Sequence, residues 1–152
     1  DMKLRSLTSI IIILLLSAMN AELRAQNVDR KALAREVKAE FLHSWNGYKK
    51  YAWGNDDLKP ISRSYHNWYS EPLLMTPVDA LDTMYLMGMK KEADRTRRYI
   101  TKNLSFDKDI SVQNFEITIR LLGGLLSAYQ ITGDKKLLAL ADDLGTRIRT
   151  SI

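Results

Sequence analysis

Glu116 and Arg120 lie four residues apart in the stretch FEITIRLLGG, and two adjacent glycines, Gly123 and Gly124, follow them. At helical spacing these residues share one face of a helix with Ser127. A carboxyl group that burial deprives of water tends to keep its proton and can act as a general acid. A glycine inside a helix costs about 0.8–1 kcal/mol relative to alanine, so a pair of them suggests that another backbone or a ligand comes very close. The pattern is therefore a candidate for general-acid chemistry on a polar substrate.

The same spacing also fits a solvent-facing ion pair, which would contribute only about 0.3–0.5 kcal/mol. Such pairs are common on helices, and on spacing alone this simpler interpretation is favoured. The two glycines argue against it, because on a purely solvated face they would bring no compensating gain.

Asp79 and Asp82 in VDALDT are the second pair of candidates. Thr76 is expected to cap a helix that has Pro77 at its first position, so Asp79 would occupy the third position and complement the helix dipole. Asp82 lies one turn further along the same face. It could belong to a polar site or support the start of the helix, and the sequence leaves both interpretations open.

Aromatic residues crowd residues 41–69, which hold eight of the thirteen in the chain. Aromatic rings stack on sugar faces, but most such clusters are core packing. The only histidines, His43 and His66, have no carboxylate at metal-ligand spacing and are expected to be structural. With no cysteine in the chain, neither a disulfide nor a thiolate metal site is possible. We therefore predict no metal ligand in this chain.

The elements that must position these residues are all predicted to be helices. Helical periodicity and turn residues place them at about 28–48, 76–88, 90–104, 112–131 and 135–148, and no strand pattern stands out. The two clearest turns, at Gly88 and Gly133, lie 45 residues apart. A repeat of this length is typical of stacked helical hairpins, in either an open solenoid or a closed α/α barrel. Because the sequence stops directly after the fifth helix, we expect it to be a fragment.

The N-terminus has the pattern of a secretory signal peptide. Lys3 and Arg5 precede an apolar run from Leu7 to Met19, and small residues follow. This run of 13 residues is shorter than the roughly 20 needed to span a bilayer. We predict a signal peptide at residues 1–26 and a domain at residues 27–152, with a short N-terminal anchor as the alternative.

Composition narrows the choice of partners. Hydrophobic residues make up 45% and charged residues 27% of the 152 residues, which is typical of a globular domain. The formal net charge is +5, but the basic residues are scattered or paired with acids. No nucleic-acid partner is predicted.

Several long motifs occur in an order that resembles one enzyme family. They are FLHSWNGYKKYAWGNDDLKPIS, HNW, VDALDTMYLMG and NFEITIRLLGGLLSAYQITGD. Together they make residues 34–148 similar to glycoside hydrolase family 47, the class I α-1,2-mannosidases. The family fold is all-α, an (α/α)7 barrel, of which this chain would be the N-terminal part.

The resemblance implies an inverting enzyme that removes terminal α-1,2-linked mannose from high-mannose N-glycans. Inversion requires an acid and a base about 6.5–9.5 Å apart. Glu116 matches the family's general acid, which acts through a water molecule, and Arg120 matches an arginine that positions the substrate. Asp79 and Asp82 match acidic positions near the cavity and are assigned to substrate binding.

The family's base and the threonine that holds its Ca²⁺ come from later helices and a C-terminal hairpin. Calcium is therefore implied by the resemblance only, with no ligand in this chain, and the chain alone is expected to be inactive. Two alternatives stay open: a non-catalytic relative that binds mannose glycans, and a helical scaffold.

The predicted protein is a secreted or periplasmic monomer that acts on mannose-rich oligosaccharides or glycoproteins. Contact with a membrane is expected only through the N-terminal segment. The alternative localisation is the lumen of the secretory pathway, with an N-terminal anchor.

Overall fold

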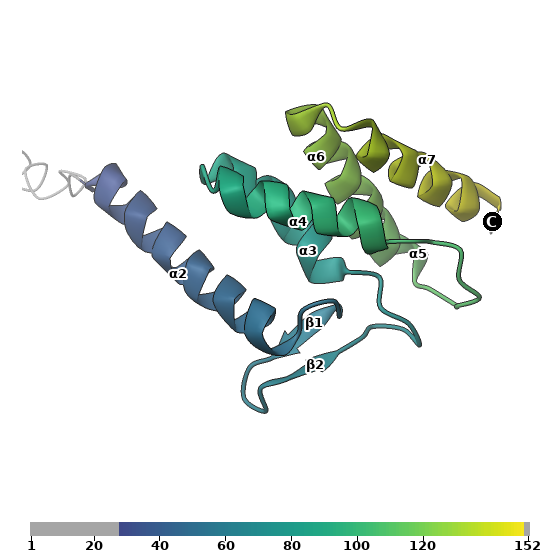
Figure 1. The fold of residues 1–152 in the computed structure, drawn as a ribbon, viewed down its shortest axis with the longest axis horizontal. Helices are drawn as coiled ribbons and strands as arrows, with labels where there is room; N and C mark the ends of the chain where they lie inside the picture. Colours follow the sequence, from purple (N-terminus) through teal and green to yellow (C-terminus); the bar gives the residue numbers. More distant parts are fainter. Residues whose placement is uncertain (1–27, 151–152) are drawn as a thin grey trace, which may run out of the picture. The chain divides into compact units, whose positions relative to one another are not determined.

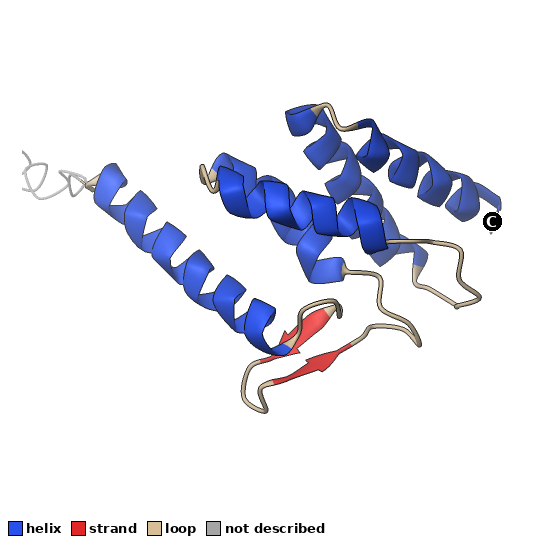
Figure 2. Ribbon diagram, viewed as in Figure 1, coloured by secondary structure: helices blue, strands red, loops and turns tan. Residues whose placement is uncertain are grey.

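The structure is a computed structural model that describes residues 28–150. Helices make up most of the described chain, and two short strands complete it (Figure 2). The predicted signal peptide at residues 1–26 lies outside the described residues. Among the helices that are described, none is long and apolar enough to cross a membrane.

The chain divides into two parts after residue 37, inside the first helix, α2 (Arg30–Tyr51). Of the first part, the structure describes residues 28–37, which include the start of α2. The second part contains the rest of α2 and all of the other elements. The site and the core described below belong to this second part alone.

Two helical hairpins make up most of the second part (Figure 1). The first pairs α3 (Met75–Leu86) with α4 (Lys90–Asn103), and the second pairs α6 (Gly123–Thr132) with α7 (Lys135–Thr150). Gly88 and Gly133 both have φ of 68°, a left-handed conformation that glycine adopts without strain. Both turns predicted from the sequence are therefore confirmed.

The predicted helix at residues 112–131 is helical from Asn114, but it is not uniform. A short α5 (Asn114–Glu116) leads into a π-helical segment, η1 (Ile117–Leu122), and α6 continues the path. In a π-helix the hydrogen bonds join residues five apart, and such segments are rare and frequently occur at functional sites. Glu116 therefore lies immediately before η1, and Arg120 lies within it.

The core lies between the two hairpins. Its most deeply buried members have no exposed surface and come from all four hairpin helices and from η1: Leu81, Met84, Ala93, Ile100, Leu121, Leu125, Ala128 and Leu137. Fully burying a leucine side chain stabilises a protein by about 1.5–3 kcal/mol. On η1 and α6 the buried row contains Leu121 and Leu125, whereas Phe115 and Ile119 are exposed on a different face.

The prediction that the chain contains no strands is wrong in one place. Strand β1 (Asp57–Lys59) pairs antiparallel with β2 (Ser64–His66), and Leu58 lies opposite Tyr65. Each strand has only three residues with mixed polarity, which is too short for alternation to be recognised. The hairpin is a small addition to an otherwise helical fold.

Asp56, just before β1, organises the irregular segment that follows. It is fully buried, and its Oδ1 accepts the backbone N–H groups of Leu73 at 2.7 Å and Met75 at 3.2 Å. Its Oδ2 accepts the N–H of Trp68 at 3.1 Å. Because each hydrogen bond to a charged group contributes about 1.5–3 kcal/mol, one carboxylate fastens residues 68–75 to the start of β1.

This carboxylate also explains why the predicted start of α3 is wrong. Thr76 does not cap the helix; its Oγ1 donates to the backbone oxygen of Asp56 at 2.5 Å. The residue at the cap position is Leu74, which has φ of 56° and offers no side-chain acceptor. Instead, Asp56, which lies 19 residues before Met75 in the sequence, accepts the N–H of Met75 at the start of the helix.

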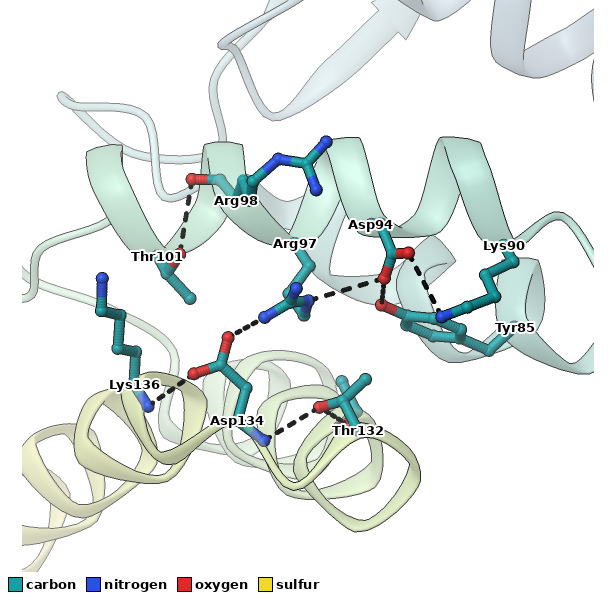
Figure 3. A network of polar contacts seen from close by, with 10 residues as sticks. Tyr85, Lys90, Asp94, Arg97, Arg98, Thr101, Thr132, Asp134 and Lys136 are labelled. Carbon is teal, nitrogen blue, oxygen red and sulfur yellow. Dashed lines mark hydrogen bonds and ion pairs between the residues drawn. The ribbon is translucent and has the colours of Figure 1, made fainter.

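A polar network fastens the α6–α7 turn to α4 (Figure 3). Arg97 of α4 forms an ion pair with Asp134 in this turn. Asp134 also accepts the N–H of Lys136 at 3.0 Å, which confirms the prediction that it caps α7. On the other side of Arg97, Asp94 accepts the hydroxyl hydrogen bond of Tyr85 at 2.8 Å. The network therefore connects both hairpins.

Candidate active site

Arg120 is the centre of the candidate site. Its Nε donates to Oε2 of Glu116 at 2.7 Å, and its Nη1 donates to Oδ2 of Asp79 at 2.8 Å. The structure thus brings together three of the four predicted site residues, one of them from a different helix. The predicted alternative, a simple solvated Glu–Arg pair, does not describe this arrangement because a second carboxylate reaches the same guanidinium from α3.

Glu116 is oriented by this contact. Its side chain is only 22% exposed, and the hydrogen bond to Arg120 occupies Oε2. Among the residues that the structure describes, Oε1 has no hydrogen-bond partner. The carboxyl group is therefore held at one oxygen while the other stays available for a proton transfer.

Asp79 meets Arg120 in a setting where burial and pairing oppose each other. Burial raises the pKa of Asp79 above its usual value of 3.8, and the hydrogen bond and charge of Arg120 reduce the size of this increase. The hydrogen bonds that Arg120 donates to Glu116 and Asp79 raise the pKa of Arg120. Burial is the larger effect on the carboxyl of Asp79, so its pKa is raised even though Asp79 is paired with Arg120.

The prediction that Asp79 occupies the third helical position and complements the helix dipole is wrong. Because α3 begins at Met75, Asp79 lies beyond the first turn, and its Oδ2 accepts from Arg120 rather than from a backbone N–H group. The earlier start of the helix follows from the hydrogen bonds that Asp56 accepts.

Asp82 lies one turn further along α3 and makes a separate contact. Its Oδ2 accepts the hydroxyl hydrogen bond of Ser127 on α6 at 2.7 Å, and its Oδ1 accepts that of Thr83 at 3.3 Å. Asp82 is therefore not in contact with Arg120, and both of its oxygens are engaged. The contact with Ser127 joins α3 to α6, which is a further role beside the two that the sequence left open, a polar site and support for the start of the helix.

The order of these contacts gives the direction of the two helices. Asp79 meets Arg120, and Asp82, further along α3, meets Ser127, further along the second helical path. The path formed by η1 and α6 therefore runs parallel to α3. Parallel inner helices joined by antiparallel hairpins are what a stack of αα units requires.

The glycines of FEITIRLLGG have different surroundings. A Cβ atom on Gly124 would lie 2.9 Å from Cγ1 and 3.3 Å from the backbone oxygen of Val78. Gly124 therefore allows α3 to approach α6, which selects the close-backbone explanation and excludes a ligand at this position. Gly123 is exposed, and a Cβ atom there would meet only the backbone oxygen of Thr118, at 3.6 Å.

Trp68 is a site residue that the sequence analysis did not identify. The guanidinium carbon of Arg120 lies over the Trp68 ring, 4.9 Å from its centroid. The sequence signal was the aromatic crowding of residues 41–69, but crowding alone does not indicate which ring reaches the site. Other members of that group, Trp45, Tyr48 and Trp53, pack against one another, with Trp45 and Tyr48 stacked at 5.3 Å.

No cluster of three or more histidine, cysteine, aspartate or glutamate side chains within residues 28–150 is arranged to hold a metal ion. Chemically, the site offers one oriented carboxyl, one half-buried carboxylate and one guanidinium group that joins them.

The fold and the site define a protein of stacked helical hairpins in which an acid and an arginine lie where two parallel helices meet. The profile of glycosyl hydrolase family 47 matches residues 40–152. The chain belongs to this family, and its hairpins are those of the family's (α/α)7 barrel over the part that it covers.

Comparisons with individual proteins agree. The chain is 52% identical over 108 residues to the endoplasmic reticulum mannosyl-oligosaccharide 1,2-alpha-mannosidase of Homo sapiens, covering 71% of this chain and 15% of the human protein. It is 42% identical over 118 residues to a mannosyl-oligosaccharide 1,2-alpha-mannosidase of Arabidopsis thaliana, covering 78% of this chain and 21% of that one.

Among solved structures, the chain resembles the alpha-1,2-mannosidase from Trichoderma reesei, with a TM-score of 0.60 and 33% identity. The match covers 77% of this chain and 26% of that structure. The chain thus spans about a fifth of the length of these relatives.

Proposed function

We propose that the protein containing this chain is an inverting α-1,2-mannosidase that removes terminal α-1,2-linked mannose from high-mannose N-glycans. Family membership and the names of the relatives support the reaction class. The observation that carries the proposal is that a part-buried Glu116 is oriented by Arg120, which is itself held by Asp79 from α3.

In the proposed reaction, the proton of Glu116 reaches the glycosidic oxygen as the bond from that oxygen to the mannose C1 breaks. A water molecule attacks C1 from the opposite face, and a general base takes the proton that this water loses. Arg120, Asp79 and Asp82 are assigned to the binding of sugar hydroxyls. The base is not assigned among the described residues, so this chain alone is expected to be inactive.

Calcium belongs to the proposal through family resemblance. Since the described residues do not form a metal site, its ligands are proposed to lie elsewhere in the whole protein. We also propose a monomeric protein that is secreted or periplasmic, with a location in the secretory pathway as the alternative.

The decisive experiment replaces Glu116 by glutamine in the protein expressed from the complete reading frame. Glutamine keeps the shape and can still accept a hydrogen bond from Arg120, but it has no proton to give to the leaving group. A positioned general acid contributes about 10²–10⁴-fold, so release of mannose from α-1,2-mannobiose should fall by that factor.

The matched control is Glu40→Gln, which changes an exposed glutamate on α2 and should leave the rate unchanged. Full activity of the Glu116→Gln variant would remove Glu116 as the acid. A wild-type protein that binds the disaccharide without cleaving it would instead be a mannose-binding relative. Nuclear magnetic resonance of the first product should show the β-anomer of mannose if the enzyme inverts.

A further inference from the structure

Trp68 is fixed at two points before it reaches Arg120. Its indole Nε1 donates to Oδ2 of Asp57, and its backbone N–H donates to Oδ2 of the buried Asp56 at 3.1 Å. The ring is thus anchored at its polar edge and at its backbone. Its face remains for contact with the guanidinium group of Arg120.

The same buried carboxylate also sets the start of α3. Oδ1 of Asp56 accepts the N–H of Met75, the first residue of that helix, and α3 carries Asp79 one turn later. Asp56 is therefore a common reference point for the ring under Arg120 and for the carboxylate beside it. Two of the three groups around the guanidinium are located by one side chain.

The three contacts leave Arg120 little freedom. Nε donates to Glu116, Nη1 donates to Asp79, and Trp68 covers one face of the guanidinium plane. Within residues 28–150, Nη2 has no hydrogen-bond partner. An arginine that is held in this way can offer Nη2 to a sugar hydroxyl in one fixed direction.

We propose that Trp68 is a positioning residue that holds Arg120 and, through Arg120, the carboxyl of Glu116. This inference rests on the proposed mannosidase function. The attraction between an aromatic face and a partly desolvated guanidinium corresponds to about a 5- to 30-fold effect on an equilibrium or rate. Without the ring, Arg120 gains other rotamers, and Glu116 loses the donor that orients it.

The test is a double-mutant cycle in the whole protein, using Trp68→Leu, Arg120→Ala and the double variant. We expect Trp68→Leu to lower kcat/KM on α-1,2-mannobiose about 5- to 30-fold when Arg120 is present. It should have less than about a twofold effect when Arg120 is absent, because positions that act through one contact are not additive. Trp68→Phe keeps the ring face and should recover most of the activity.

The matched control is Tyr65→Leu, an exposed aromatic residue on β2, which should change kcat/KM by less than about twofold. Equal losses from Trp68→Leu in both backgrounds would overturn the inference, because the ring would then act on the fold and not through Arg120. If Arg120→Ala does not fold, Arg120→Gln takes its place in the cycle.

A second readout separates this inference from the proposed function. The same four proteins are unfolded with urea, and the coupling between positions 68 and 120 is taken from their stabilities. If the wild-type protein releases no mannose, the proposed function fails, and the unfolding cycle alone judges the contact. Coupling in that cycle supports the proposal that Trp68 holds Arg120, and additive effects overturn it.

Discussion

Arg120 shows how a single side chain joins residues that are distant in the sequence. Its partner Glu116 is four residues away, and periodicity reveals that pair directly. Its partner Asp79 is 41 residues away, and no pattern in the sequence marks that contact. The carboxylates were predictable as candidates because of their types and positions on helices, but their shared contact with Arg120 required the packing of α3 against η1.

Replacing Asp79 by asparagine should change how stability depends on pH. Because burial raises the pKa of Asp79 in the folded protein, its contribution to stability is fully present below the usual value of 3.8 and is lost as the pH rises through the raised value. Asparagine does not ionise, so the variant does not lose stability in this way as the pH rises. Its melting temperature should therefore improve relative to the wild type between acidic and neutral pH.

The measurement is thermal unfolding of both whole proteins across that pH range. The difference between them at each pH matters, and not its absolute size, since asparagine also weakens the pairing with Arg120. Parallel curves would show that burial does not raise the pKa of Asp79. If the wild type instead gained stability over the asparagine variant as the pH rises, pairing with Arg120 would outweigh burial.

At the scale of elements, the helices and their turns could be predicted because their signals are local. Gly88 and Gly133 ended helices as expected, and Asp134 capped α7. The missed features depend on distant partners or on unusual hydrogen bonding. The start of α3 was not predictable from local residues because its acceptor is Asp56. The π-helical segment η1 was not predictable because one wider turn leaves the 3.6-residue periodicity of the surrounding helix almost unchanged.

The contact between α3 and α6 predicts opposite effects for two neighbouring substitutions. Gly124→Ala should destabilise the protein by about 1–3 kcal/mol, because its Cβ atom would meet the buried and stiff side chain of Val78 at 2.9 Å. Gly123→Ala should stabilise it by up to about 1 kcal/mol, since alanine favours the helix and a Cβ atom has room there. Urea unfolding of the whole protein measures both changes.

The activity of the Gly123→Ala variant tests the other expectation for the glycine pair, which is that a ligand comes very close to it. If a substrate lies against Gly123, the Gly123→Ala variant should be more stable and yet less active. Unchanged activity would leave close helix packing, at Gly124, as the only reason for the glycine pair.

At the scale of the whole molecule, the described residues contain the proposed general acid but not an assigned general base. They carry the proposed acid and the arginine that orients it, and the family profile covers residues 40–152. The chain nevertheless spans only 15% of the human relative and 26% of the matched fungal structure. The base and the calcium ligand could not be assigned from this sequence because the family resemblance places both in later helices and a C-terminal hairpin, and no group of three or more histidine, cysteine, aspartate or glutamate side chains within residues 28–150 is arranged to hold a metal ion.

Removal of calcium should therefore distinguish the role of the proposed metal ion from that of the proposed acid, Glu116. A chelator should abolish mannose release by the whole protein, and added Ca²⁺ should restore it. The Glu116→Gln variant should bind Ca²⁺ with unchanged affinity in calorimetry, because Glu116 is not a proposed ligand. Activity that persists in the chelator would remove calcium from the proposal, and weaker binding by the variant would place Glu116 near the ion.

The π-helical segment η1 separates two demands that one helix would otherwise have to meet together. Downstream of it, the rows of small and apolar side chains on α6 must match the surface of α3. Upstream of it, α5 must present Glu116 in a chosen direction around the helix axis. The wider π-helical turn between them adds an angular offset, so Glu116 points in a different direction around the axis, relative to the packed face of α6, than it would on an uninterrupted α-helix.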